Sequence, residues 1–149
     1  MEVRRSPELD ALANEARAAY ERGDVEWFAA HLADGEFVMT GSAPGEIWRG
    51  KDFYLDLIEH AKEAWAAQQV HYDLGEVETY EAGDAGFAVW HHRLVLEDGS
   101  YIPSRGITVY ARDADGWKMI GRFFGVLAPD ELQAPGSPLA VSESPQSSR

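Results

Sequence analysis

The sequence predicts an α+β fold, with helices in the first part of the chain and a curved antiparallel sheet in the second. Hydrophobic residues recur at helical spacing up to residue 67, whereas from residue 70 apolar and polar residues alternate. Short turn-like links, EAGDAG, EDGS and DADG, join the four alternating segments. Strands connected so tightly pair as antiparallel neighbours, and helices that precede them cover one face of the sheet.

Three helices are expected in the first part of the chain. Ser6 can cap the first helix, Pro7 suits its first position, and Gly23 can end it. Asp24 can cap a second, short helix. The longest helical pattern covers Lys51–Ala67, with its apolar residues on one stripe.

Five strands are expected. A short apolar strand covers Phe37–Thr40, and the segment GSAPGEIWRG after it is rich in turn residues and predicts a loop. The four alternating segments are Val70–Tyr80, Phe87–Leu96, Tyr101–Arg112 and Trp117–Leu127.

Composition narrows the class of protein. The 149 residues suit a single domain, and the absence of cysteine excludes thiolate metal sites and thiol nucleophiles. The 26 acidic residues against 13 basic ones give a net charge of −13, which disfavours nucleic acids and anionic membranes as partners. No apolar run has the length of a membrane span or signal peptide, so we expect a soluble cytoplasmic protein.

The end of the chain differs from the rest. Residues 129–149 contain four of the seven prolines, five serines and no aromatic residue. Such a segment buries too little apolar surface to offset the entropy of ordering it. We therefore expect a folded domain at residues 7–128 and a disordered tail at 129–149.

Two segments carry a resemblance to a known family. They are AYERGDVEWFAAHLADGEFVMTGSAPGEIWRGKD and RGITVYARDADGWKMIGRFFGV. In these segments the chain resembles the SnoaL-like, ketosteroid-isomerase-like branch of the nuclear transport factor 2-like superfamily. The resemblance implies a cone-shaped barrel, in which a strongly curved sheet wraps around the N-terminal helices and encloses one deep pocket. It also implies pairing of two copies through the sheet. It does not name an activity, because this fold supports many functions.

The residues that steroid isomerases use are missing. The resemblance places their helix-one tyrosine at Ala16 and their catalytic aspartate at Thr40. Their second acidic residue falls near Ile107 to Val109, where there is no carboxylate. Proton abstraction by that route is therefore not expected.

Alternation along each strand separates two faces. Val89, His91 and Arg93 share one face of their strand, and the resemblance implies that this face lines the pocket. A three-residue loop at Glu97–Gly99 places His91 opposite Arg105, whereas a two-residue turn places it opposite Gly106 and aims Arg105 outward. The family pattern favours the first alternative.

His91 beside Arg105 or Arg93 is the candidate catalytic group. A histidine near a buried cation stays neutral and can act as a base, and the arginines suit a carboxylate or enolate oxygen. The structural alternative is that Arg93 pairs with a carboxylate such as Asp73 while His91 fills the core. No cofactor is expected, and no metal, because His91 and His92 point to opposite faces.

The candidate pocket is lined mainly by aromatic residues, of which Tyr20, Trp27, Tyr54 and Trp117 also suit the core. Trp48 lies in the turn-rich loop, where it either covers the pocket or anchors the loop. The predicted pocket residues are Tyr20, Trp27, Trp48, Tyr54, Val89, His91, Arg93, Arg105, Trp117, Met119 and Phe123.

The other face of the sheet is unusually apolar for an exposed surface. Its proposed members are Trp90, Leu94, Ile120 and Phe124, and either a homodimer or the tail would cover them. The sequence thus predicts a SnoaL-like domain that binds a small, mostly apolar molecule. The alternatives are a cofactor-free isomerase, dehydratase or cyclase acting on a small carbonyl compound, and a homodimeric association module.

Overall fold

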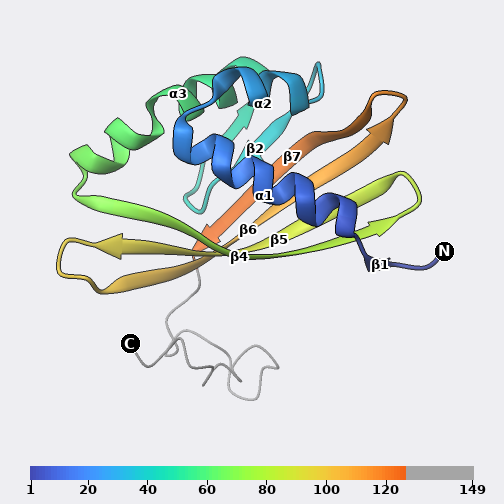
Figure 1. The fold of residues 1–149 in the computed structure, drawn as a ribbon. Helices are drawn as coiled ribbons and strands as arrows, with labels where there is room; N and C mark the ends of the chain where they lie inside the picture. Colours follow the sequence, from blue (N-terminus) through green and yellow to red (C-terminus); the bar gives the residue numbers. More distant parts are fainter. Residues whose placement is uncertain (127–149) are drawn as a thin grey trace.

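The computed structural model describes residues 1–126, and the predicted tail at 129–149 lies outside them. Within the described residues, three helices cover one face of a seven-stranded sheet (Figure 1). The helices are α1 (Pro7–Arg22), α2 (Val25–His31) and α3 (Lys51–Ala67). The strands are β1 (Arg4–Arg5), β2 (Val38–Thr40), β3 (Ile47–Arg49), β4 (Val70–Ala82), β5 (Ala85–Leu96), β6 (Tyr101–Asp113) and β7 (Gly116–Val126). This arrangement confirms the predicted α+β class.

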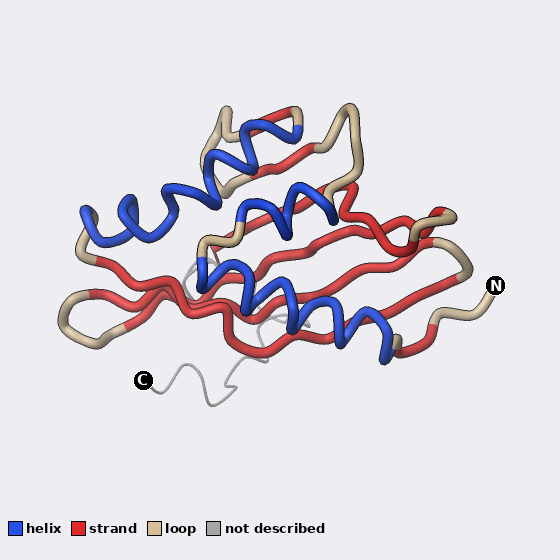
Figure 2. The backbone as a smooth tube through the Cα atoms, turned by 45° about the horizontal axis from the view of Figure 1, so that its top comes forward, coloured by secondary structure: helices blue, strands red, loops and turns tan. Residues whose placement is uncertain are grey.

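The sheet curls around the helices without closing (Figure 2). Its strand order is β1-β4-β5-β6-β7-β2-β3, and every neighbouring pair is antiparallel except β2 with β7. We call the face that carries the helices the inner face and the opposite face the outer face. No helix within residues 1–126 has both the length and the apolarity that a membrane crossing requires.

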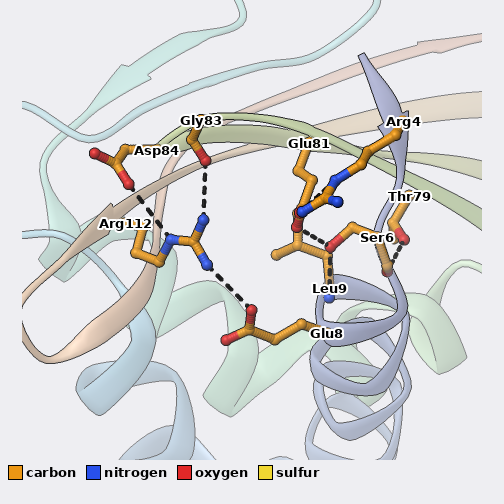
Figure 3. A network of polar contacts seen from close by, with 9 residues as sticks. All are labelled: Arg4, Ser6, Glu8, Leu9, Thr79, Glu81, Gly83, Asp84 and Arg112. Carbon is orange, nitrogen blue, oxygen red and sulfur yellow. Dashed lines mark hydrogen bonds and ion pairs between the residues drawn. The ribbon is translucent and has the colours of Figure 1, made fainter. Parts of the chain in front are cut away.

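The first helix begins as its sequence predicts. Ser6 is fully buried, and its side chain accepts a hydrogen bond from the Leu9 amide at 3.2 Å. The Ser6 hydroxyl also donates to the Glu81 carboxylate at 2.5 Å, and Arg4 contacts the same carboxylate at 2.8 Å (Figure 3). At the same end of α1, Arg112 on β6 pairs with Glu8 at 3.2 Å. These contacts fix the start of α1 to the sheet.

The Ser6→Ala variant is expected to lose about 1 kcal/mol of unfolding free energy, because it removes the helix cap. Urea denaturation followed by circular dichroism measures this loss. Ser42→Ala, in an exposed loop, is the matched control and is expected to leave stability unchanged. Equal stability of the two variants would show that the cap does not stabilise α1.

Two short strands escaped prediction, β1 and β3. The segment GSAPGEIWRG was predicted as a loop, but its last part forms β3, which pairs with β2 and places Trp48 opposite Met39. The segment contains three glycines and one proline, which are typical of loops, and a strand of only three residues does not outweigh them in the sequence pattern. The pairing of β3 with β2 is long enough to fix the loop but too short to produce an alternating pattern.

The register between β5 and β6 is the predicted one. Leu96 and Ser100 pair across the three-residue loop through a hydrogen bond of 2.8 Å, and Gly99 takes the left-handed conformation with φ of +85°. His91 accordingly lies opposite Arg105. Their face was predicted wrongly, however, since His92 is buried beneath the helices and His91 lies on the outer face.

A bulge in β7 changes which residues of that strand point inward. Val109 pairs with Gly121 but Tyr110 pairs with Met119, so Ile120 is the extra residue. Met119 is buried before the bulge, and Arg122 reaches inward after it. Simple alternation would have kept Arg122 on the outer face.

Candidate ligand cavity

A small cavity lies between the helices and the inner face of the sheet. Its volume is about 10 Å³, which is the space of one water molecule. Ten residues from both layers line it: Ala16, Arg17, Tyr20, Phe28, Leu74, Trp90, Thr108, Tyr110, Met119 and Arg122. It is therefore a narrow, mostly apolar space with two cationic side chains.

Arg122 reaches the cavity from β7. Its Nη1 donates to the Tyr54 hydroxyl at 3.3 Å, and its Nη2 lies 3.5 Å from His92 Nε2. Among the described residues, Arg122 has no carboxylate partner. A cation in this position, surrounded by phenols and an imidazole, leaves its charge uncompensated.

Arg17 reaches the same cavity from α1. Its Nη2 donates to the carbonyl of Gly75, and its guanidinium lies 5.6 Å from the centre of the Trp90 ring. Gly75 belongs to a bulge of β4 and has a φ of +61°, so the strand presents this carbonyl to the helix. Arg17 Nε is buried and has no hydrogen-bond partner within residues 1–126.

His92 is the buried titratable group next to the cavity. Its ring stacks on Tyr72 with centres 4.9 Å apart, and a Cβ at Gly106 would lie 2.8 Å from its Nε2. Burial, reinforced by the positive charges of Arg122 and Arg17, lowers the pKa of His92 to about 2. The ring is neutral at pH 7, and because Arg122 donates toward Nε2, Nδ1 carries the proton. Nδ1 is buried without a partner among the described residues.

Tyrosine hydroxyls complete the surroundings. Burial raises the pKa of Tyr72 and Tyr110 well above the usual value, so both phenols stay protonated and can donate hydrogen bonds. The Tyr110 hydroxyl has Thr108 as its hydrogen-bonding neighbour, and the Ser104 hydroxyl has Tyr72. Arg17 Nε and His92 Nδ1 are the buried donors without a partner near the cavity in the part of the chain that is described.

A larger groove of about 440 Å³ lies next to the cavity, on the side of α3 and the start of β4. Tyr20 and Leu74 line both spaces, so they form the wall between them. Trp65 Nε1 donates to the Tyr20 hydroxyl at 3.1 Å, and the Trp65 ring stacks on Tyr72 at 5.4 Å. The hydrogen bond from Trp65 thus holds the Tyr20 ring in this wall.

The predicted catalytic pair does not face the cavity. His91 lies on the outer face with its Nε2 2.9 Å from Glu78, a contact that lowers the pKa of that carboxyl. Arg93 pairs with Asp73 at 3.1 Å, as the structural alternative expected, but His91 does not fill the core as that alternative also expected. Arg105 is exposed on the same face. The outer face also carries two further residues that were predicted to line the pocket, Val89 and Phe123.

The remaining predicted pocket residues divide into two groups. Tyr20 and Met119 line the cavity, and Tyr54 contacts Arg122 beside it. The other three are tryptophans with other roles. Trp27 stacks on His31 at 3.9 Å, Trp48 stacks on Phe53 at 5.0 Å and so anchors its loop, and Trp117 packs under Arg112 at 4.5 Å.

Sequence reasoning missed three polar residues that line the cavity, Arg17, Tyr110 and Arg122, and two residues beside them, Tyr72 and His92. One signal was available for Arg17, which interrupts the apolar stripe of the first helix three residues before Tyr20. No local feature of the sequence predicts that Arg122 points inward, because the direction of its side chain depends on the bulge in β7.

The described residues contain one cluster with metal-ligating side chains close together. Asp56, Glu59 and His60 lie within 4.8 Å of one another on α3, and all three are exposed. Exposed acidic groups of this kind are common on helices, and the cluster is separate from the cavity lining.

Comparison with solved structures places the fold among the nuclear transport factor 2-like proteins. The chain is similar to an NTF2-like protein of unknown function from Pseudomonas putida KT2440, with 18% identity and a TM-score of 0.63, covering 88% of this chain and 95% of that one. It is also similar to a proposed dehydratase of the NTF2-like family from Streptomyces avermitilis, with 20% identity and a TM-score of 0.60, covering 83% and 100%. The CaMKII hub of S. rosetta has 18% identity and a TM-score of 0.62, covering 82% and 98%.

The family follows from the sequence itself. Residues 9–122 match the model of the SnoaL-like domain, so the chain belongs to the SnoaL-like domain family. This confirms the resemblance inferred from the two sequence segments. No curated protein matches the chain significantly.

Proposed function

We propose that this SnoaL-like domain binds a small, mostly apolar molecule between α1 and the inner face of the sheet. The observation that carries the proposal is a pair of buried donors without a partner among the described residues: Arg17 Nε, from a residue that lines the cavity, and His92 Nδ1, whose ring lies beside Arg122. Folded proteins satisfy nearly all buried polar groups, so two exceptions beside one cavity support a missing partner. A bound molecule would supply it.

The ligand needs more room than the cavity of about 10 Å³ offers. The wall between the cavity and the groove depends on Tyr20, whose hydroxyl accepts one hydrogen bond from Trp65. Breaking such a bond costs about 0.5–1.5 kcal/mol, which a small ligand can offset. Apolar lining from Phe28, Leu74 and Met119 then contacts the body of the ligand.

Binding is favoured over acid–base catalysis because the described residues that line the cavity include no carboxylate and no histidine. A general base works best with a pKa near the operating pH, whereas the pKa of His92 is lowered to about 2. The alternative of an isomerase, dehydratase or cyclase is supported only by the donors of Arg122 and Tyr110, which could stabilise an enolate oxygen.

Native mass spectrometry of the freshly purified chain tests the binding proposal. We expect a retained small molecule, or one taken up from a fragment library, and we expect Arg122→Gln to reduce its occupancy. Arg105→Gln is the matched control, since Arg105 lies exposed on the outer face. Retention that responds equally to both changes, or no binding of any fragment, would contradict the proposal.

The outer face supports a second proposal, that two copies associate through it. Ile107, Ile120 and Phe123 are 38%, 41% and 42% exposed on the neighbouring strands β6 and β7. The predicted interface had the wrong members, because Trp90 is 2% exposed under the helices and Leu94 pairs with Tyr72 on the inner face.

Phe124 was also assigned to that interface, and its ring contacts Tyr72 and His92 on the inner face instead. Of the four predicted residues only Ile120 is exposed. A homodimer would therefore pack through the exposed apolar residues of β6 and β7, which are Ile107, Ile120 and Phe123.

A charged residue substituted into this exposed apolar group is expected to dissociate the dimer. We expect the wild-type chain to be a dimer at micromolar concentration and Phe123→Glu to be a monomer, as measured by light scattering after size exclusion. Ile102→Glu is the matched control, since Ile102 is comparably exposed but pairs with Leu94 on the inner face. A wild-type monomer would rule out this interface.

A further inference from the structure

Two arginines share one cavity and neither pairs with a carboxylate among residues 1–126. Arg17 comes from α1 and Arg122 from β7, so they approach from the helix layer and from the sheet. Other arginines of the described chain find acidic partners: Arg4 with Glu81, Arg5 with Asp10, Arg22 with Asp24, Arg93 with Asp73, and Arg112 with Glu8. Arg49 and Arg105, which have none in the same region, are exposed to water.

This arrangement is unexpected in so acidic a chain. The sequence has 26 acidic residues, yet none of the described ones lies beside Arg17 or Arg122 at ion-pair distance. Two cations that line one narrow, mostly apolar space repel each other and lose part of their hydration, which is unfavourable without a counter-charge. Both positive charges also lower the pKa of His92, so the two guanidinium groups lie near the same side chain.

The unpartnered polar atoms specify the missing group further. Arg17 Nε and His92 Nδ1 both carry hydrogens. A site of donors is complementary to a group that only accepts, and an ionised carboxylate is such a group. Phosphate has the same charge sign but suits this site less, because Phe28, Leu74 and Met119 leave few donors for its remaining oxygens.

The neighbouring groove specifies the body of the ligand. Its walls include the rings of Tyr20, Trp65 and Tyr72, with Trp65 and Tyr72 stacked at an interplanar angle of 11°. Flat apolar molecules pack well against such rings. A carboxylate in the cavity with its flat body in the groove would use both spaces.

On the basis of the binding function above, we propose that the ligand is a small aromatic carboxylate, held by Arg122 and Arg17, that reaches them from the groove past Tyr20. The guanidinium of each arginine takes the carboxylate oxygens, while the ring of the ligand replaces Tyr20 beside Trp65 and Tyr72.

Three pairs of probes test this assignment on the full chain: benzoate and benzamide, salicylate and salicylamide, phenylacetate and phenylacetamide. Binding is measured by titration of amide chemical shifts and of tryptophan fluorescence. At least one acid is expected to bind at least tenfold more tightly than its amide, with shifts at the inner residues of β5 to β7. Arg122→Gln and Arg17→Gln should each weaken the acid at least tenfold and leave the amide nearly unchanged. Arg105→Gln should change neither.

The outcomes separate this inference from the binding function. Equal affinity of acids and amides for the cavity would overturn the carboxylate assignment while the binding function stands. Failure of all six probes to bind would overturn the assignment, and failure of the fragment library as well would overturn the binding function. Inorganic phosphate that binds as tightly as the best acid, with the same arginine dependence, would overturn the choice of carboxylate. If Arg122→Gln does not fold, Arg122→Lys keeps the charge, and it should still lose affinity because it lacks the planar fork.

Discussion

Lowering the pH from 7 to 5 is expected to reduce the unfolding free energy of the wild-type protein by about 2 kcal/mol more than that of the His92→Gln variant. In the folded protein, burial and two nearby arginines lower the pKa of His92 to about 2. In the unfolded chain the same histidine titrates near its ordinary value of about 6.5. Below that pH the unfolded state binds a proton at His92 that the folded state does not bind, so the unfolding free energy decreases as the pH falls.

The pH window isolates this effect from the carboxylates. Glu78 and Glu81 have lowered pKa values, and the stability they contribute is lost as the pH falls below about 4.5. Urea denaturation at pH 5, 6 and 7 gives the free energies. His71→Gln, an exposed histidine on β4, serves as the control and should keep the wild-type pH dependence. A His92→Gln variant with the same pH dependence as the wild type would show that His92 titrates normally in the folded protein.

Local chemistry made the elements and one register predictable. The cap at Ser6, the left-handed Gly23 and the cap at Asp24 mark the ends of α1 and α2 as expected. The register of β5 with β6 followed from loop length, because the glycine at position 99 fits a three-residue loop. These features depend on residues close in sequence, and a single chain displays them.

The choice of sheet face could not be predicted from alternation, because both faces of β5 and β6 are apolar enough for a core. Contact with a helix decides it. A Cβ at Gly86 would lie 2.4 Å from Leu9, and one at Gly106 would lie 2.8 Å from His92. Small residues therefore mark the face that the helices approach, and this signal would have placed His92 inward.

The position of Arg122 was beyond a sequence argument of this kind. Its direction depends on one extra residue, Ile120, in the pairing of β7 with β6. A bulge adds one residue without a distinctive composition, and it exchanges the faces of all residues that follow it. The candidate site was therefore assigned to the face of His91. The predicted combination, a histidine beside an arginine, is nevertheless present on the other face, where His92 lies beside Arg122.

Replacement of Arg122 by methionine is expected to raise the unfolding free energy of the ligand-free protein by about 1–2 kcal/mol. The change removes a cation that has no counter-ion among the described residues, and with it the cost of desolvating that charge; even buried ion pairs replaced by apolar residues of similar volume often stabilise proteins by about 1–4 kcal/mol. Against this stands the loss of two contacts, to Tyr54 at 3.3 Å and to His92 at 3.5 Å, each worth about 1 kcal/mol or less.

The same variant is expected to lose carboxylate binding, so stability and function should move in opposite directions. Thermal and urea denaturation of ligand-free protein measure the first, and titration with the acid probes measures the second. Arg93→Met is the control, because Arg93 has its partner Asp73 on the exposed outer face and should give little change in either measurement. If Arg122→Met destabilised the ligand-free protein instead, Arg122 would be a structural residue whose charge the surrounding phenols already accommodate. A gain in stability with a loss of binding is the result that only a residue kept for a ligand would give.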